Sequence, residues 1–312
     1  MGMLSIAFYN LENFFDTYDD PDTLDDDFTP KGIMHWIKKR YFNKANKIGK
    51  TIGRIGYKET GSAPAIVGLA EVENKKVLYD LTHTRALKKY HYRYIHFESK
   101  DLRGMDVALL YRPSVFEVLD TAVYPVELYN DRGEVYQSRD ILYCKGKLCG
   151  EFVHLFINHW PSRREGELES EQKRKLAAMR LSEQLSYIKY EENSPKIILM
   201  GDFNTHPDDL HIKNEILSMG FINPAIHFMR KKQGTTVHQK HWLMFDQILF
   251  SDNFFQNRNT CHYKDFKIYK PGFLSVWKGK LKGFPFRTYQ GIHYQNGYSD
   301  HFPVYALLEK DF

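Results

Sequence analysis

The sequence predicts a protein of the α/β or α+β class, in which β-sheets are covered by helices. Short apolar runs alternate roughly with segments of helical periodicity, a pattern typical of sheets flanked by helices. Tyr and Phe are numerous, with 21 and 22 residues, which favours strands over a helical bundle. The sequence has no repeat at a solenoid period and no low-complexity tract, so an ordinary globular fold is expected.

Composition narrows the class further. Of the 312 residues, 42% are apolar and 27% are charged, as in folded soluble proteins, and the net charge of +5 permits a polyanionic substrate without requiring one. No apolar run approaches the roughly 20 residues that span a membrane. Because the first residues lack a signal-peptide pattern, we expect a cytoplasmic protein or the trimmed mature form of an exported one.

The first half of the chain supplies two strands that end in polar residues. Residues 4–10 read as a strand that reaches Asn10, with Glu12 just beyond it, and residues 65–71 form a buried strand that ends in Glu71. Helices are expected at residues 41–56 and 74–87, the first with an apolar stripe at helical spacing. Residues 92–97 and 107–112 are expected to pair as strands, and residues 115–128 and 139–144 add further strands.

The second half repeats this pattern. A strand over residues 149–158 ends in His159, a position that is more often structural than catalytic but here precedes a basic loop. A long helix is expected at 166–190, followed by a buried strand at 197–200, where Gly201 allows a sharp turn before Asp202 and Asn204. Such strand ends are common active-site positions, although an Asx turn explains Asp202 and Asn204 equally well. A helix at 211–219 completes this part.

The last strands carry a second candidate pair. Asp246 lies near the start of an apolar strand at 245–251, where a buried carboxylate needs a partner, and a His is the natural one. Asp300 and His301 precede the final strand at 304–308. We therefore expect His301 to be that partner.

Three other segments are charged or reactive. Residues 16–27 contain seven Asp, but they lack the Gly and closing Glu of a calcium loop, so a solvated acidic loop is favoured. Residues 254–289 are basic and aromatic, which suits phosphate contacts with stacking or, equally, a solvated loop over a small core. Cys144 and Cys149 could close a hairpin, but buried free thiols, with Cys261, are favoured.

The polar residues at the strand ends define one chemistry. They are Asn10, Glu12, Glu71, His159, Asp202, Asn204, Asp246, Asp300 and His301. Oxygen donors dominate and no Cys joins them, which predicts a Mg²⁺ or Mn²⁺ site rather than a structural zinc site. The two histidines add acid–base capacity. No Ser nucleophile elbow and no P-loop is present.

These motifs resemble the endonuclease/exonuclease/phosphatase superfamily, which has the DNase-I-like fold. The resemblance rests on the order of Asn10-Leu-Glu12, Glu71, Asn158-His159, Gly201-Asp-Phe-Asn204, Asp246-Gln-Ile-Leu and Ser299-Asp-His301, and it spans residues 4–308. The opening motif, the turn around Arg103 and the Asn-His-Trp-Pro-Ser-Arg-Arg run look like a bacterial branch of largely uncharacterised members. It implies one domain over residues 1–312, built as a four-layer αββα sandwich of two mixed sheets.

The resemblance also implies roles. Glu71 would be the principal metal ligand, with Asn10, Glu12 and Asp300 beside it. Asp202 would activate the attacking water, Asn204 would hold the phosphate, and His301, oriented by Asp246, would stabilise the transition state. His159 would donate to a phosphate oxygen. In abasic-site nucleases a Tyr motif replaces this His, so the pattern is closer to nonspecific nucleases, sphingomyelinases and phosphatases.

We therefore expect a monomeric, divalent-metal-dependent phosphodiester hydrolase, with nucleic acid as the leading substrate. Arg103, in a turn, Arg163 and Trp277 are the expected substrate contacts, although an ordinary hairpin role explains Arg103 equally well. The alternatives are a phospholipid hydrolase of the sphingomyelinase type and a sugar- or inositol-phosphate phosphatase. Outside enzymes, the alternative is an inactive nucleic-acid-binding module.

Overall fold

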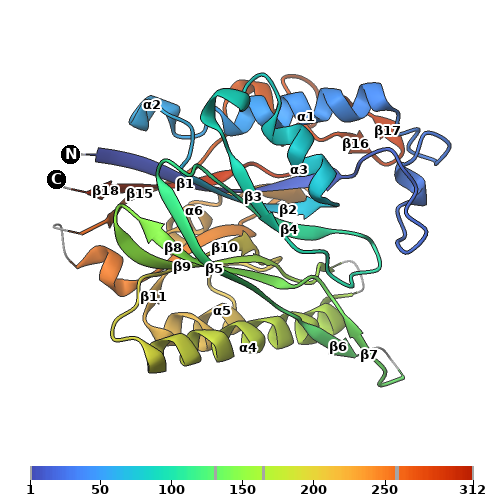
Figure 1. The fold of residues 1–312 in the computed structure, drawn as a ribbon. Coiled ribbons are helices and arrows are strands. Elements are labelled where there is room, and N and C mark those ends of the chain that lie inside the picture. Colours follow the sequence, from blue (N-terminus) through green and yellow to red (C-terminus); the bar gives the residue numbers. More distant parts are fainter. Residues whose placement is uncertain (1, 130–131, 164–165, 257–259, 311–312) are drawn as a thin grey trace.

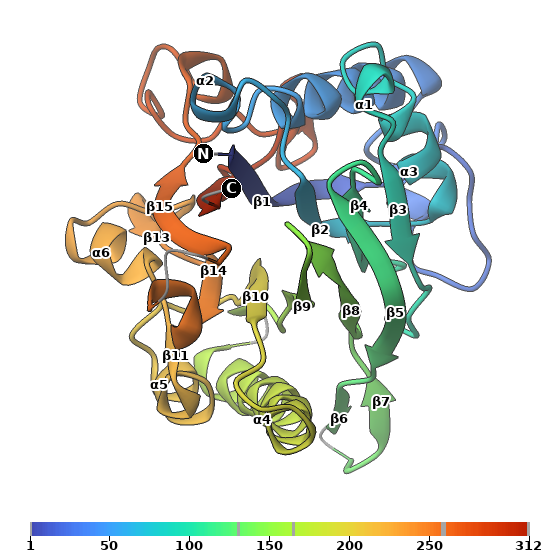
Figure 2. The same cartoon turned by 60° about the vertical axis from the view of Figure 1, so that its left-hand side comes forward.

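Two six-stranded mixed sheets stack face to face, with helices on both outer faces (Figures 1 and 2). The structure, a computed structural model, describes residues 2–129, 132–163, 166–256 and 260–310. α1 (Lys38–Ile52) and α3 (Lys75–Thr82) cover the first sheet, and α4 (Glu167–Glu191) covers the second. This is the four-layer sandwich predicted from the resemblance, so the predicted fold class is confirmed.

The first sheet, here sheet A, joins the two ends of the chain. Its order is β15 (His262–Ile268), β18 (Val304–Lys310), β1 (Gly2–Phe14), β2 (Ile66–Val72), β4 (Asp106–Tyr111) and β3 (Arg93–His96). β1 pairs antiparallel with β18 and parallel with β2, so the N-terminal strand lies at the centre of the sheet.

The second sheet, here sheet B, is built from the middle of the chain. Its order is β11 (Phe221–Ile222), β14 (Asp246–Ser251), β10 (Ile197–Asp202), β9 (Glu151–His159), β8 (Ile141–Leu148) and β5 (Phe116–Tyr124). β9 and β10 are parallel, like β1 and β2 in sheet A. The carboxyl ends of these two parallel pairs carry most of the predicted site residues, and they meet at one rim of the sandwich.

Packing between the sheets fixes their relative position. The inner faces form one core that includes Phe8, Leu109, Leu155 and Met200. A Cβ atom at Gly68 of β2 would lie 2.7 Å from the Met200 sulfur atom, so any larger residue there would force the Met200 side chain in the inner core to move. Two outer cores lie under the helices, and the apolar stripe of α1 that the sequence predicts is buried in one of them.

The remaining elements are short. Three two-stranded ribbons are β6 (Glu127–Tyr129) with β7 (Val135–Gln137), β12 (Thr236–His238) with β13 (His241–Leu243), and β16 (Tyr289–Gln290) with β17 (His293–Tyr294). The short helices are α2 (Tyr57–Thr60), α5 (Leu210–Glu215) and α6 (Ala225–Arg230), with 3₁₀ turns at Asp26–Phe28, Lys88–Tyr90, Leu217–Met219, Asp252–Phe255 and Gly272–Leu274. Among the described residues, no helix has both the length and the apolar character that a membrane span needs.

Several predicted segments differ from the structure. The basic segment 254–289 contains an unpredicted edge strand, β15, and its aromatic residues Phe273, Phe284 and Phe286 pack against Tyr298 and Trp242. The loop 16–27 is not fully solvated, because Asp16 and Asp25 are buried. All three cysteines are free thiols, as favoured, and Cys144 and Cys261 are buried, whereas Cys149 is only partly buried.

Candidate active site

The ends of β1 and β2 hold two glutamates in an unusual backbone conformation. Glu12 and Glu71 have φ angles of 52° and 61°, in the left-handed region that non-glycine residues seldom adopt. Both lie where strand pairing is irregular, between Asn10 and Phe14 on β1 and between Ala70 and Val72 on β2. A bulge re-aims a side chain, so these irregularities turn both carboxylates toward the rim.

Glu71 is the more open of the two. Its Oε1 accepts a hydrogen bond from Asn10 Nδ2 at 3.3 Å and its Oε2 accepts one from Asn13 N at 2.7 Å, and its side chain keeps 19% of its surface exposed. Asn10 Nδ2 also donates to Asp202 Oδ2 at 3.1 Å, while its Oδ1 accepts from Glu12 N at 3.0 Å. Asn10 therefore ties the carboxylates of the two sheets together.

Glu12 is closed in by cations. Arg287 Nε donates to Glu12 Oε1 at 3.1 Å, and Thr288 N donates to Oε2 at 2.5 Å. The buried Lys44 Nζ donates to the Glu12 carbonyl oxygen and to Thr288 Oγ1. Burial and then Asp300 raise the pKa of Glu12, whereas Lys44 and Arg287 oppose the rise. Arg287 also donates to Asp300 Oδ2 at 2.9 Å, so it bridges two predicted metal ligands.

Asp202 leaves β10 beside β9. A Cβ atom at Gly201 would lie 2.3 Å from the Asn158 carbonyl oxygen, so glycine is required by the close approach of β9, and the strand continues through Asp202 without the predicted sharp turn. Asp202 Oδ1 accepts from Asn204 N at 2.9 Å, which is the Asx turn considered from the sequence. Oδ2 stays turned toward Asn10. Burial raises the pKa of Asp202, and His301 opposes the rise.

His301 and Asp246 form a buried pair. His301 Nδ1 lies 2.7 Å from Asp246 Oδ2, and His301 Nε2 lies 3.9 Å from Asp202 Oδ2. Burial lowers the pKa of His301, but the Asp246, Asp202 and Asp300 carboxylates outweigh burial and hold this pKa well above its usual range. The imidazole is therefore expected to be charged at neutral pH.

His159 lies beside the carboxylates of both Glu71 and Asp202. Its Nε2 lies 3.9 Å from both Glu71 Oε1 and Asp202 Oδ2. The buried Arg139 donates to the backbone oxygens of His159 and Trp160, which fixes the end of β9. Asn204 Nδ2 donates to the same Trp160 oxygen at 2.9 Å, so the strand ends of sheet B are tied to one another.

An open cavity of about 560 Å³, here the rim pocket, is lined by Glu71, His159, Asp202, Asn204, Asp300 and His301, whereas Asn10, Glu12 and Asp246 are not among its lining residues. Arg103 and Arg163 contribute to its wall, as the sequence predicts for substrate contacts, and Arg163 Nε donates to the Asn204 carbonyl oxygen at 3.2 Å. Trp277 is 72% exposed and is not among the residues that line this pocket; its ring lies 4.4 Å from Lys278 Nζ. The structure therefore does not bring Trp277 to the site.

Sequence reasoning missed other residues at this rim. Arg287 was seen only as one charge of a basic segment, and Lys44 was not noted, although it follows Tyr41 by one helical turn and stands next to Ala45 on the buried stripe. A lysine on the apolar stripe of a helix is a recognisable signal. His238, Gln239 and His241 of the β12–β13 ribbon also line the pocket, and no pattern in the sequence marked them.

The side chains at the rim can be compared with the ligands that a hard divalent cation requires. Within the described ranges, ligand atoms of Asp202, Asp246 and His301 lie within 4.8 Å of one another, while Arg287 stands between Glu12 and Asp300. Glu71 and Asp202 both approach His159 Nε2, so two carboxylates are close together in a buried place. A cation bound between them would offset their repulsion, and oxygen donors are the ligands that Mg²⁺ and Mn²⁺ prefer. The residues fit such an ion.

The architecture is that of DNase-I-like proteins. The family model described as endonuclease/exonuclease/phosphatase family matches residues 5–310, and the chain therefore belongs to this family. The membership predicted from the motifs is confirmed. No curated protein matches the chain in sequence.

Solved structures extend the comparison of the fold. A humanised D. rerio TDP2 is 17% identical, with coverage of 99% of both chains and a TM-score of 0.60. A mannosyl-6-phosphatase of Bacteroides thetaiotaomicron is 17% identical, with coverage of 98% of this chain and 99% of the other and a TM-score of 0.59. An endonuclease/exonuclease/phosphatase from Bacteroides vulgatus is 15% identical over 100% of both chains, with a TM-score of 0.60. At these identities the likeness concerns the fold alone.

Proposed function

We propose that the protein is a divalent-metal-dependent phosphodiester hydrolase whose leading substrate is nucleic acid. We propose also that its active site belongs to one domain, formed by both sheets. The observation that carries this proposal is the His301–Asp246 pair, because it sets a charged imidazole beside the Asp202 carboxylate in an open pocket. An acid and a base held side by side, with pKa values shifted by their surroundings, are what proton transfer at a phosphate needs.

The proposed roles follow from the contacts. Asp202 Oδ2 aligns and deprotonates the attacking water, because its Oδ1 is held by the Asn204 backbone. His301 faces the phosphate through Nε2, since Asp246 holds Nδ1, and it stabilises the negative charge that grows there. Asn204 and His159 hold phosphate oxygens. Arg103 and Arg163 on the pocket wall add phosphate contacts.

A metal ion would be held by Glu71, with Asp202 close by and Asn10 aligning both carboxylates. Bound there, Mg²⁺ or Mn²⁺ supplies Lewis-acid polarisation of a phosphate oxygen. Glu12 and Asp300 remain proposed ligands only if Arg287 releases them. With Arg287 in place, Glu12 serves to hold the end of β1.

Two observations bear on the substrate. Nucleic acid is favoured by the arginines on the pocket wall, and one similar fold, D. rerio TDP2, is described in complex with a single-strand DNA product. A sugar phosphate is the second candidate, because His238, Gln239 and His241 offer polar groups suited to hydroxyls, and the similar Bacteroides thetaiotaomicron protein is a mannosyl-6-phosphatase.

A substrate panel tests the proposal. Hydrolysis of bis-p-nitrophenyl phosphate, p-nitrophenyl phosphate, plasmid DNA, RNA and sphingomyelin should be measured with Mg²⁺, with Mn²⁺ and with EDTA, for the native chain and for His301→Ala. Metal-dependent cleavage of the diester and of nucleic acid, abolished in the variant, is expected. Cleavage of p-nitrophenyl phosphate alone would favour the sugar-phosphatase candidate, and cleavage of sphingomyelin alone the phospholipid hydrolase. Nucleic-acid binding without any hydrolysis would overturn the enzyme assignment.

A further inference from the structure

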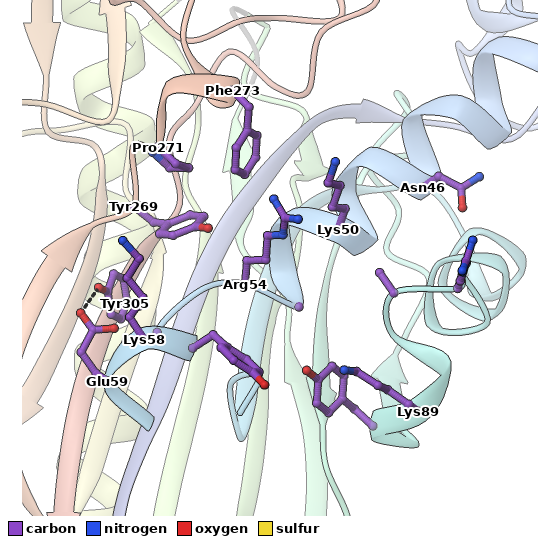
Figure 3. A pocket seen from close by; sticks show the side chains of 16 residues that line it. Asn46, Lys50, Arg54, Lys58, Glu59, Lys89, Tyr269, Pro271, Phe273 and Tyr305 are labelled. Carbon is purple, nitrogen blue, oxygen red and sulfur yellow. Dashed lines mark hydrogen bonds between the residues drawn. The ribbon is translucent and has the colours of Figure 1, made fainter. Parts of the chain in front are cut away.

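A cavity larger than the rim pocket lies away from the rim. It has a volume of about 1150 Å³, against about 560 Å³ for the rim pocket, and the two share no lining residue. Its walls come from the end of α1, from α2, from the turn after α3, and from the chain between β15 and the following 3₁₀ turn. We call this cavity the α1 groove (Figure 3).

The α1 groove is cationic. Five exposed basic side chains from these separate segments line it: Lys50, Arg54, Lys58, Arg85 and Lys89. Glu59 is the only acidic residue in the lining. It accepts a hydrogen bond from the Tyr305 hydroxyl at 3.1 Å (Figure 3), and Lys267, outside the lining, lies 2.8 Å from it. Across the described part of the chain, none of the five cations has an ion-pair partner.

The helix dipole explains only part of this charge. Lys50 and Arg54 stand near the C-terminus of α1, where cations are favoured. Lys58, Arg85 and Lys89 come from other segments, and their convergence on one hollow gives it a positive potential that attracts anions. The lining therefore points to an anionic ligand.

Aromatic rings stand among these charges. Arg54 lies over the Phe273 ring at 5.7 Å and Lys89 lies over the Tyr90 ring at 4.8 Å, and Tyr57 is 46% exposed. Figure 3 shows Arg54 directed toward Tyr269 and Phe273, with Lys89 reaching across from the turn after α3. Among these rings Tyr57 is the exposed one, and an exposed ring between cations suits single-stranded nucleic acid, because a base can stack on the ring while the cations contact phosphates.

The helix α1 connects this groove to the rim. Lys44, on the same helix, reaches the Glu12 carbonyl oxygen, and Lys50 follows it on α1 at a rise of about 9 Å. A strand of a few nucleotides covers such a distance. We propose that the α1 groove is a second, non-catalytic site that binds a single-stranded segment of the nucleic-acid substrate, an inference that rests on the proposed function.

Two matched variants test this site. In the groove variant, Lys50, Arg54 and Lys89 are changed to Gln. In the control variant, three exposed lysines elsewhere are changed to Gln: Lys175 on α4, Lys213 on α5 and Lys231 directly after α6. Both lower the net charge by three. Binding of a 12-residue thymidine oligonucleotide is measured in EDTA, so that hydrolysis does not interfere.

The groove variant should bind the oligonucleotide about tenfold more weakly, and the slope of log affinity against log salt should fall by up to about 0.7 for each phosphate that the variant no longer neutralises. The control variant should differ less than twofold from the native chain. Equal effects of the two variants, or no effect of the groove variant, would overturn the site.

A third measurement tests the stacking of bases in the groove. The native chain should bind the thymidine oligonucleotide roughly fivefold or more tightly than an abasic oligonucleotide of equal length, since each stacked base adds affinity, and Tyr57→Ala should remove much of this preference. Equal binding of the two oligonucleotides by the native chain would overturn the assignment to nucleic acid.

Turnover of bis-p-nitrophenyl phosphate separates the two proposals. This substrate is too short to reach the α1 groove, so the groove variant should hydrolyse it at the native rate. Reduced oligonucleotide affinity with native turnover supports the site. If the native chain hydrolyses no diester, the proposed function fails, and the EDTA binding experiment still decides whether the groove binds single strands.

Discussion

The end of β1 and the end of β2 place two glutamates in the same backbone conformation but in opposite electrostatic surroundings. Glu12 has 4% of its side chain exposed and is held by Arg287, with Lys44 beneath it. Glu71 keeps 19% of its side chain exposed, and its nearest basic group is the His159 ring at 3.9 Å. The comparison shows that position at a strand end does not decide function. We therefore propose that Glu12, already paired with a protein cation, serves the structure, and that Glu71, without such a cation, is the one that can bind a metal.

The largest effect on turnover is expected at His301, which lines the rim pocket together with Glu71. If Glu71 binds the metal, the growing phosphate charge needs a protein cation on the other side, and His301 is the candidate. His301→Ala should lower turnover by roughly 10²–10⁴-fold, the usual scale for a positioned acid–base group. Asp246→Asn should cost less, because the ring remains but loses its orienting charge.

A double-mutant cycle of turnover with His301→Ala and Asp246→Asn checks the pairing. The double variant should be little worse than His301→Ala, since the two residues act as one unit. Fully additive losses would show that they act separately.

Metal affinity is the most direct test of the difference between Glu71 and Glu12. Glu71→Gln should weaken Mn²⁺ binding by on the order of 10-fold to 100-fold, because it removes a charged oxygen ligand from a hard cation. Glu12→Gln should change the same affinity only a few-fold, since Arg287 already engages this carboxylate. Isothermal titration with Mn²⁺ measures both. Equal losses in the two variants would mean that Arg287 moves aside and that Glu12 is a ligand as well.

The free energy of unfolding should show the reverse order, with a larger loss for Glu12→Gln than for Glu71→Gln. Glu12→Gln sets an amide nitrogen against Arg287 or the Thr288 N–H and leaves a buried donor without an acceptor, at a cost of about 1–3 kcal/mol. Glu71→Gln should cost less, because its site is partly exposed and lacks an internal cation. Urea unfolding in EDTA compares them. A larger loss for Glu71→Gln would contradict the structural role given to Glu12.

The smallest effect is an effect on stability at Asp140, a carboxylate that is not among the residues lining the rim pocket. Burial and then Asp106 raise the pKa of Asp140 from 3.8 to about 6, although Lys100 opposes the rise, and within the described residues its Oδ1 has no hydrogen-bond partner. A raised folded-state pKa means that its stabilising contribution is complete below pH 3.8 and is lost as the pH rises through about 6. Asp140→Asn, which resembles the protonated form, should therefore gain stability over the native chain as the pH rises from about 4 to about 6.

Urea unfolding at several pH values checks this. The difference between Asp140→Asn and the native chain should be smallest at the acidic end of this range. A difference that does not change with pH would show that burial leaves this carboxyl group unperturbed, and it would weaken the same burial argument for Glu12.

The sequence revealed the fold and the polar residues at the strand ends because their signals are local. Apolar runs that end in Glu71, Asp202 and Asn204 can be read from neighbouring residues alone. The residues that seal Glu12 could not be found in this way, because Lys44 and Arg287 come from positions far along the chain and meet Glu12 only after sheet A forms. The burial of Asp25 was missed for another reason: its carboxylate accepts hydrogen bonds from Asp20 N and Thr23 Oγ1 within the acidic loop itself, and the run of Asp residues gave no sign of this local turn.

The chain order of sheet A has a consequence for biosynthesis. Every strand of sheet B lies between residues 116 and 251, so this sheet can form from one continuous stretch of nascent chain. Sheet A cannot, because β1 is made first and its antiparallel partner β18 spans Val304–Lys310. Until that strand leaves the ribosome, one edge of β1 is unpaired and open to wrong partners, and β15 has no strand to join. Translation of β18 therefore controls when Asn10 and Glu12 of the β1 end come together with His301, which directly precedes β18.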